Sequence, residues 1–291
     1  MIPASFEYSS PKTLSEAISL LQRLGPDAKI LAGGQSLIPL MKLRMASPKH
    51  LIDLNRISDL SYIRESDGHL TIGALTREAD LDSSELIRAK YPIIADTAAV
   101  IGDPLVRNMA TVGGNLAHAD PANDHPATML ALGAEVVATG PKGARRIPVT
   151  ELFTGLFTTS LRPDEILTEI RVPIPPARSG GAYLKVERKV GDFATAAVAA
   201  QITLGSGNTC QSVGIGLTNV GMTPIKAVRA EKALQGKPAD EKNIQEAARI
   251  ASEEAEPTAD LRGSVEYKRS LVRVLTARAL RQAVKRAQGG H

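Results

Sequence analysis

Cysteine and aromatic residues are scarce in this sequence of 291 residues. Cys210 is the single cysteine, so the chain alone can form neither an internal disulfide nor a Cys-ligated iron–sulfur cluster or zinc ribbon. Tryptophan is absent and only five Tyr and four Phe are present, which argues against the aromatic surfaces that hold single-stranded nucleic acids or quaternary amines. Binding therefore has to depend mainly on backbone and polar groups.

Long apolar runs are also missing from the sequence. No stretch approaches the ~18 apolar residues of a membrane span, and the opening MIPASFEYSS lacks the basic and apolar regions of a signal peptide. We therefore expect a cytoplasmic protein without a membrane span. With 43% hydrophobic and 23% charged residues, the composition is that of a folded globular chain and not of a disordered one.

Positive charge is concentrated at the C-terminal end. The formal net charge is +4, and the last 26 residues, from Glu266, hold seven Lys and Arg against one acidic residue. The apolar positions here share one helical face, so we expect a core-packed helix with a solvated basic side. A nucleic acid or an acidic surface is the alternative use of that side, and we predict no nucleic-acid partner. The apolar positions are Leu271, Val274, Leu275 and Leu280.

The first part of the chain alternates short strands and helices. Thr13 and Glu16 have the spacing of a capping box at a helix start, and Asp67-Gly68 suits a tight hairpin turn. The predicted elements are a helix over 14–24, strands over 29–32 and 50–54, a hairpin over 62–75, helices over 81–101 interrupted at Tyr91-Pro92, a short helix over 127–132, a hairpin over 136–149 and a strand over 164–173.

A domain boundary is predicted at 173–181, where three prolines and two glycines within nine residues cannot continue a helix or a sheet. Strand-like runs then precede helical segments, an order that favours a small antiparallel sheet covered by helices. The predicted strands cover 182–188, 194–204 and 212–220, and the helices are centred near Ala230, Ala248 and Leu275.

Two diglycine loops are candidate binding features. Gly33-Gly34 follows a strand, and Gly113-Gly114 lies in a second Gly-rich turn bordered by short polar side chains. Without side chains, successive backbone N–H groups approach a diphosphate closely and form an anion-binding concavity, so two such loops can clamp one pyrophosphate. Tight turns alone also explain each glycine pair, and the spacing does not decide between the two interpretations.

Other motifs carry less chemistry. Neither G-x-G-x-x-G between a strand and a helix nor G-x-x-x-x-G-K-[ST] is present, and 214–221 is better explained as strand and turn. The segment from His118 to His125 holds two His and two Asp, which permits a metal site, but a polar loop that binds a ligand or caps the helix at Pro126 is the favoured interpretation. Asp124 is its most interesting residue.

Several long segments resemble the FAD-binding medium subunit of molybdenum hydroxylases, a family that includes the carbon monoxide dehydrogenase medium chain and relatives among the xanthine and aldehyde dehydrogenases. The likeness runs from Phe6 to about Arg286 with the motifs in the same order. The segments are AGGQSLIPLMKLRMASPKHLIDLNRI (32–57), LTIGALT (70–76), VRNMATVGGNLAHADPANDHPATMLALGAEV (106–136) and LKVERKVGDFATAAVAA (184–200).

The resemblance implies an α+β fold. An FAD-binding domain of the VAO/PCMH type would cover 1–177, as two α/β subdomains over about 1–55 and 56–177. A C-terminal domain like that of the carbon monoxide dehydrogenase flavoprotein, with an antiparallel sheet plus helices, would cover 178–291.

The resemblance also implies an FAD site. The AGGxS and TVGG loops bind the diphosphate in that family, the residue matching Asp124 contacts ribityl and adenosine-side hydroxyls, and the lysine matching Lys185 reaches the isoalloxazine ring. Phe193 stands where close relatives often have Tyr, so stacking is retained and a phenolic hydrogen bond is lost. The implied FAD-binding residues are Lys29, Ala32, Gly33, Gly34, Gln35, Ser36, Leu37, Ala110, Thr111, Val112, Gly113, Gly114, Asn115, Asp124, Leu167, Lys185 and Phe193.

The family's division of labour agrees with the single cysteine. It implies a molybdenum-cofactor large subunit that hydroxylates substrate, a [2Fe–2S] small subunit that passes electrons on, and FAD in this chain that delivers them to NAD, a quinone or another soluble acceptor. A dimer of heterotrimers is the implied assembly, with no acid–base catalyst and no metal in this chain. One alternative is a self-contained flavin oxidoreductase of the same fold, with its own proton donor for a small-molecule substrate. Another is a non-enzymatic binding module that uses the basic tail.

Overall fold

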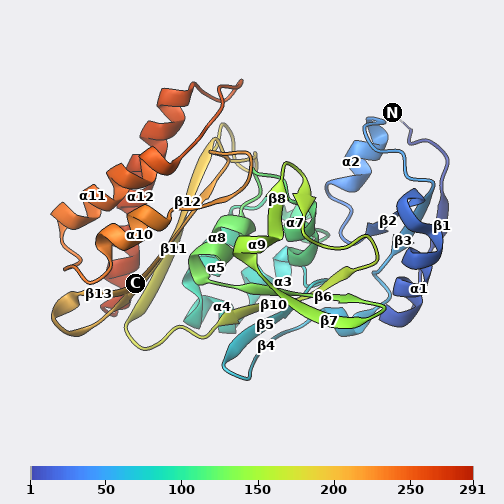
Figure 1. The fold of residues 1–291 in the computed structure, drawn as a ribbon, viewed down its shortest axis with the longest axis horizontal. Helices are drawn as coiled ribbons and strands as arrows, with labels where there is room; N and C mark the ends of the chain where they lie inside the picture. Colours follow the sequence, from blue (N-terminus) through green and yellow to red (C-terminus); the bar gives the residue numbers. More distant parts are fainter. Residues whose placement is uncertain (1, 291) are drawn as a thin grey trace.

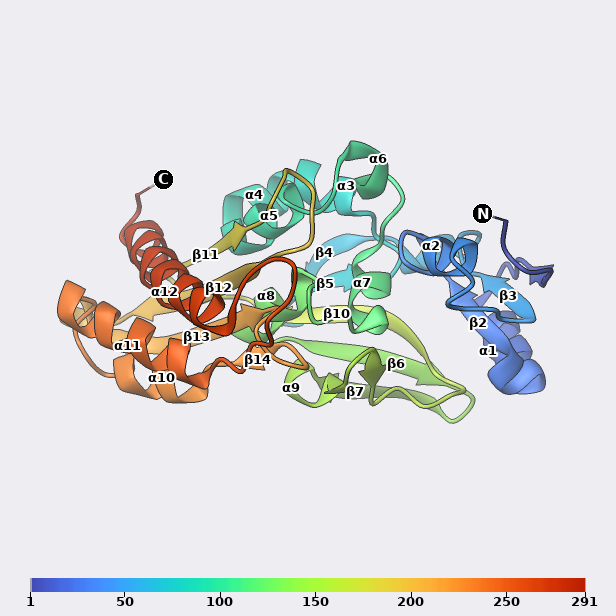
Figure 2. The same cartoon turned by 90° about the horizontal axis from the view of Figure 1, so that it is seen from above.

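The computed structural model describes residues 2–290, which form three parts that follow one another along the sequence. The N-terminal part and the C-terminal helices lie at opposite ends of the long axis, with the middle part between them (Figures 1 and 2). No helix within the described residues has both the length and the apolar character needed to cross a membrane.

The N-terminal part is a small parallel sheet in the order β1-β3-β2, with helix α1 against it. The Thr13 hydroxyl accepts the Glu16 N–H and so begins α1 as predicted, and Ala17, Ile18 and Leu21 form its buried face. The elements are β1 (Glu7–Ser9), α1 (Leu14–Leu24), β2 (Ala28–Leu31), α2 (Leu37–Lys42) and β3 (His50–Asp53). The first diglycine loop therefore joins β2 to α2.

The middle part is a five-stranded antiparallel sheet in the order β4-β5-β10-β6-β7, with helices packed on one face. Asp67 and Gly68 both have positive φ, so the predicted hairpin turn is confirmed. The elements are β4 (Ile63–Ser66), β5 (His69–Gly73), α3 (Glu78–Ser83), α4 (Glu85–Lys90), α5 (Pro92–Ala99), α6 (Pro104–Arg107), α7 (Val112–His118), α8 (His125–Leu132), β6 (Glu135–Gly140), β7 (Gly143–Pro148), α9 (Val149–Leu152), β8 (Phe153–Gly155), β9 (Thr158–Thr159) and β10 (Ile166–Pro173).

The C-terminal part is the predicted antiparallel sheet covered by helices. Both faces of its central strand are buried: Ala197 and Ala199 pack into the middle core, whereas Val198 and Ile202 pack toward the C-terminal helices. The elements are β11 (Ser179–Val186), β12 (Ala196–Leu204), β13 (Cys210–Thr218), β14 (Ile225–Lys226), α10 (Val228–Leu234), α11 (Glu241–Glu254) and α12 (Val265–Ala287). Small residues dominate β12 because helices approach it from both sides.

The expectation that the glycines of 173–181 cannot continue a sheet is wrong. Strand β11 begins at Ser179 and includes Gly180, where a Cβ would overlap the backbone of α12 at Ala283. Gly214 and Gly216 in β13 are glycines for the same reason, because the backbone of α8 packs directly against this strand. These glycines therefore record close helix–sheet packing and not a turn or a nucleotide motif.

We predict that Gly216→Ala destabilises the protein by about 1–3 kcal/mol, because the new methyl group meets the Ala127 carbonyl in a packed core. Gly155→Ala is the matched control, since its Cβ would lie 3.8 Å from Thr158 in ordinary contact and should change stability by less than about 0.5 kcal/mol. Urea unfolding of both variants measures the difference. Equal unfolding midpoints for the two variants would contradict this packing.

Candidate functional site

One cavity of about 810 Å³ lies where the N-terminal part meets the middle part and the start of the C-terminal sheet. Its volume falls within the ~300–1,000 Å³ usual for ligand sites. Val112 alone among the implied FAD-binding residues does not line it, because its side chain is fully buried in the core. The implied residues that line the cavity are Lys29, Ala32, Gly33, Gly34, Gln35, Ser36, Leu37, Ala110, Thr111, Gly113, Gly114, Asn115, Asp124, Leu167, Lys185 and Phe193.

The loop between β2 and α2 brings unpaired backbone donors to this cavity. The described chain supplies no acceptor for the consecutive N–H groups from Gly33 to Leu37. Gly34 has a φ of +76°, which L side chains rarely adopt, and a Cβ there would lie 2.6 Å from the Ile38 side chain. Successive free N–H groups in a tight loop are the donors of an anion-binding concavity.

The second diglycine loop is built differently, because its glycines lie in the first turn of α7. The Gly113 N–H donates to the Ala74 carbonyl at 3.0 Å, and the Gly114 N–H donates to the Thr111 hydroxyl at 3.2 Å. The Asn115 N–H donates to the Thr111 carbonyl at 2.9 Å. The expectation that this loop offers free N–H groups like the first is therefore wrong. It offers the Thr111 hydroxyl hydrogen and Asn115 Oδ1, a buried atom without a partner in the described residues.

The two loops touch each other behind the cavity. A Cβ on Gly33 would overlap the Met109 carbonyl and lie 2.8 Å from the Ala110 Cα. A Cβ on Gly114 would lie 3.7 Å from the Ala32 Cβ. The two loops, from separate parts of the fold, thus form one continuous wall, and glycine at 33 is required because backbone packs directly on backbone.

A buried pair of charged side chains also lines this cavity. Asp124 Oδ2 is 3.1 Å from Lys185 Nζ, and Asp124 Oδ1 accepts from the Tyr183 hydroxyl at 2.5 Å. Burial raises the pKa of Asp124, and the Lys185 cation and the Tyr183 hydrogen bond oppose that rise. Lys185 Nζ also lies 3.3 Å from Glu187 Oε2 and donates to the Val100 carbonyl at 3.1 Å, so the ammonium is held at one place.

Phe193 lies at the mouth of the cavity with 47% of its surface exposed. Its N–H donates to the Asp192 carboxylate, which also receives Arg188 and Arg262. Burial alone raises the pKa of Asp192, but these hydrogen bonds, above all that from Arg262, hold it below the ordinary value. A loop that precedes α12 therefore fixes the loop that carries Phe193.

Comparison with known proteins agrees with this geometry. Residues 4–175 match the family described as the FAD binding domain in molybdopterin dehydrogenase, and residues 181–283 match the CO dehydrogenase flavoprotein C-terminal domain. The chain is 46% identical to the carbon monoxide dehydrogenase medium chain of Afipia carboxidovorans, over 99% of this chain and 100% of that relative. The chain belongs to the family of FAD-binding medium subunits of molybdenum hydroxylases.

Solved structures support the same membership. Carbon monoxide dehydrogenase from Hydrogenophaga pseudoflava, in a form that lacks the Mo-pyranopterin moiety, matches with a TM-score of 0.95 and 48% identity, over 98% of this chain and 99% of that chain. Quinoline 2-oxidoreductase from Pseudomonas putida 86 matches with a TM-score of 0.91 and 34% identity, over 99% of each chain. The resemblance, the α+β fold class, the FAD cofactor and the place in an oxidoreductase are thereby confirmed.

The chemistry of the cavity of this flavoprotein fits FAD. The unpaired N–H groups from Gly33 to Leu37 suit the anionic oxygens of a diphosphate. The unpartnered Asn115 Oδ1 is an acceptor for a ligand hydroxyl or N–H. Apolar side chains that include Leu31, Ile101 and Leu167 form much of the remaining wall and suit the ring systems.

The two His and two Asp of 118–125 do not converge on one point. His125 Nε2 lies 2.7 Å from Glu78 Oε2 in the core, and Asp120 Oδ1 accepts the Ala122 N–H. Asp124 stands at the N-cap position of α8, but its carboxylate makes no cap hydrogen bond and instead meets Lys185 in the cavity wall, so the predicted capping role is wrong and the predicted ligand-binding role stays a prediction. Within 2–290, no group of three His, Cys, Asp or Glu is arranged to hold a metal ion.

His118 and Phe157 also line the cavity but are not among the implied FAD-binding residues. Their ring centroids lie 5.2 Å apart, and burial lowers the pKa of His118, with Asp120 opposing it. Phe157 has a φ of +53°, a backbone conformation usually taken by glycine or asparagine and rarely by a bulky residue. The residue type at this position therefore gave no indication of the turn. For His118, the indication in the sequence was its place in the polar segment 118–125.

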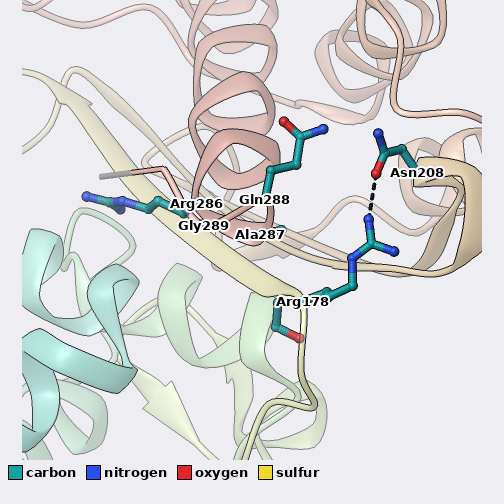
Figure 3. A pocket seen from close by; sticks show the side chains of 7 residues that line it. Arg178, Asn208, Arg286, Ala287, Gln288 and Gly289 are labelled. Atoms are coloured by element: carbon teal, nitrogen blue, oxygen red, sulfur yellow. Dashed lines mark hydrogen bonds between the residues drawn. The ribbon is translucent and has the colours of Figure 1, made fainter.

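A second cavity of about 600 Å³ lies at the C-terminal end of α12 (Figure 3). Arg178 in its wall already donates to the Gly205 carbonyl and to Asn208 Oδ1, each at 2.6 Å. Arg286 pairs with Asp96 of the middle part at 2.6 Å. The Arg286–Asp96 pair joins the C-terminal part to the middle part, and the cavity shares no residue with the one that both glycine loops line.

Helix α12 differs in part from the expectation of a solvated basic side. Lys268 is 1% exposed and holds Asp260 at 2.8 Å, and Arg281 pairs with Glu241 of α11. Val274 is 42% exposed and does not belong to the buried face. Several of the basic side chains thus fasten the C-terminal part and do not form an open basic surface.

We predict that Lys185→Met destabilises the FAD-free protein by about 3 kcal/mol near pH 8, because it leaves the buried Asp124 carboxylate unpaired. The substitution raises the pKa of Asp124 further above its unfolded value. A raised folded pKa favours folding below that pKa and disfavours it above, so the deficit should shrink as pH falls from about 8 to about 5.

Urea unfolding across this pH range measures the effect. Lys189→Met, a change of an exposed lysine in the following loop, is the control and should lose little stability at any pH. A deficit for Lys185→Met that stays constant with pH would contradict the pairing of this lysine with Asp124.

Proposed function

We propose that this chain is the flavin station of a three-subunit molybdenum hydroxylase. In this proposal a large subunit hydroxylates substrate at its molybdenum cofactor, and a small subunit carries the electrons through [2Fe–2S] clusters to the FAD of this chain. The FAD then reduces NAD, a quinone or another soluble acceptor. The single cavity that unites both glycine loops with the Asp124–Lys185 pair is the observation that supports this most strongly.

The proposed site assigns a different task to each wall. The free N–H groups of Gly33 to Leu37 bind the diphosphate, while Thr111 and Asn115 add a hydroxyl and an amide at the N-terminus of α7. Asp124 and Lys185, which line the same cavity, bind hydroxyls and the flavin ring. When bound, FAD takes up electrons singly and releases them in pairs.

The proposed domain division is 1–177 and 178–291, with subdomains over about 1–55 and 56–177. Three clusters of buried apolar side chains, one for each part of the fold, support it. Tyr183, Ala197 and Ala199 belong to the middle cluster, so the two domains would share a packed interface that fixes the cavity between them.

Exposed apolar side chains near the mouth support a protein partner there. Val190 is 93% exposed, Leu261 is 96% exposed and Leu105 is 79% exposed. The segments that carry them meet next to one another, because Arg262 donates to Asp192 at 3.0 Å and a Cβ on Gly191 would lie 3.0 Å from the carbonyl of Gly102, which shortly precedes α6. Exposed apolar side chains that lie together mark interaction surfaces. We name the surface around Leu105, Val190 and Leu261 the docking surface and assign it to the [2Fe–2S] subunit in a dimer of heterotrimers.

The same-fold alternative, a self-contained oxidoreductase, needs a proton donor in the cavity. Of the titratable side chains that line it, Asp124, Glu165 and Asp192 are held in ion pairs. Among the side chains that line the cavity, His118 has the ordinary pKa nearest to neutrality, so it is the residue that this alternative would use, but burial lowers that pKa and disfavours the protonated donor form.

Purification of the native complex tests the proposed function. We expect one acid-releasable FAD for each copy of this chain, accompanied by one partner that carries molybdenum and another that carries iron and labile sulfide. Leu261→Asp should weaken retention of the iron–sulfur partner by about tenfold or more without reducing FAD content, because it places a charge on the docking surface.

Val274→Asp, on the exposed side of α12, is the matched control and should retain the partner. A partner-free chain that turns over substrate with FAD alone, and loses this activity in His118→Gln, would overturn the proposal in favour of the self-contained enzyme.

A further inference from the structure

Arg77 connects the two glycine loops from behind the cavity wall. It stands at the N-terminus of α3, and its guanidinium donates to the Met109 carbonyl and, at 2.6 Å, to Asn55 Oδ1. The Met109 carbonyl is the atom on which Gly33 packs, and it lies next to Ala110 at the start of the second loop. Neither Arg77 nor Asn55 lines the cavity, so neither belongs to the FAD-contacting set.

Asn55 carries the connection on to the first loop. Its Nδ2 donates to the Ala32 carbonyl at 2.9 Å and to Asp53 Oδ1 at 2.6 Å. The Tyr8 hydroxyl donates to the other Asp53 oxygen at 2.5 Å, which fixes that carboxylate on the N-terminal sheet. Since Nδ2 faces two acceptors and Oδ1 faces the guanidinium, the orientation of the amide is determined by its partners.

The backbone at Arg77 pairs with the backbone of the second loop. Arg77 forms an isolated antiparallel bridge with Thr111, and the N–H of Glu78 donates to the Ala110 carbonyl at 3.0 Å. Arg77 therefore contacts the second loop through its backbone and is connected to the first loop through its side chain and Asn55. A planar guanidinium donates to two separated oxygens at once, which an ammonium point charge does not do with the same geometry.

We infer that Arg77 and Asn55 form a clasp that sets the distance between the two loops for the diphosphate of FAD. They are positioning residues, and the inference rests on the diphosphate site of the proposed function. The physical reason is that the donors of the two loops are fixed to different parts of the fold. Their spacing is then held by the Gly33 contact and by this chain of hydrogen bonds from the Ala32 carbonyl to the Met109 carbonyl.

The test compares the FAD affinity and the FAD-free stability of Arg77→Gln, Asn55→Ala and the double variant. We expect each single change to weaken FAD binding by at least about tenfold, since each removes hydrogen bonds of a charged group or its partner. The double variant should bind no worse than the weaker single variant, because the two residues act as one unit. Arg77→Lys should recover only part of the affinity, since it keeps the charge and loses the fork.

Arg56→Gln is the matched control, because Arg56 is exposed, lies next to Asn55, and interacts with this network only through a weak electrostatic effect on the exposed Tyr8. It should bind FAD as the unaltered protein does. A purely structural role predicts that affinity falls only as far as unfolding explains, so urea unfolding of the FAD-free variants is measured beside each titration. Should Arg77→Gln fail to fold, the comparison of Arg77→Lys with Arg56→Gln decides.

Two outcomes overturn the clasp: FAD affinity within twofold of the unaltered protein in the Arg77 variants, or fully additive effects of the two single changes. Thr111→Val separates this failure from failure of the site itself. If Thr111→Val weakens FAD binding and the Arg77 variants do not, the proposed site stands without a clasp. If none of them changes FAD affinity, the clasp and the proposed contribution of Thr111 to the site are both wrong.

Discussion

The close approach of Gly33 to the Met109–Ala110 backbone is the constraint on which the flavin site depends. It presses a loop of the N-terminal parallel sheet against the segment that leads into α7, so that two separate parts of the fold share one wall. A side chain at 33 would force these parts away from each other. The free N–H groups of the first loop and the Thr111 hydroxyl of the second thereby line one cavity, where we propose that FAD binds.

The C-terminal part completes the cavity with its own residues. The C-terminal sheet is buried on both faces, so Lys185 on β11 and the loop that carries Phe193 are held against the middle part. Ion pairs such as Arg286–Asp96 cross between the parts and resist their separation. A cavity between packed parts of a fold is a common place for a large cofactor, because side chains from several parts together bury most of its surface.

Local sequence patterns predicted much of this architecture. The Thr13 cap, the Asp67-Gly68 hairpin and the antiparallel C-terminal sheet depend on neighbouring residues, and all three are present in the structure. The sequence did not predict that the N–H groups of Gly113 and Gly114 are already hydrogen-bonded. One donates to Ala74, which is distant in sequence, and the other lies in the first turn of α7, where two glycines are unusual. The Arg77–Met109 contact spans 32 residues and has no local pattern at all.

Amide hydrogen exchange with and without excess FAD tests the central claim most directly, because it reports on the backbone groups that the two loops contribute. The account predicts that FAD strongly slows exchange at Gly34 to Leu37, whose N–H groups have no acceptor in the described chain. The N–H groups of Gly113 to Asn115 should exchange slowly even without FAD and change little. Unchanged exchange at Gly34 to Leu37 on saturation with FAD would contradict the account.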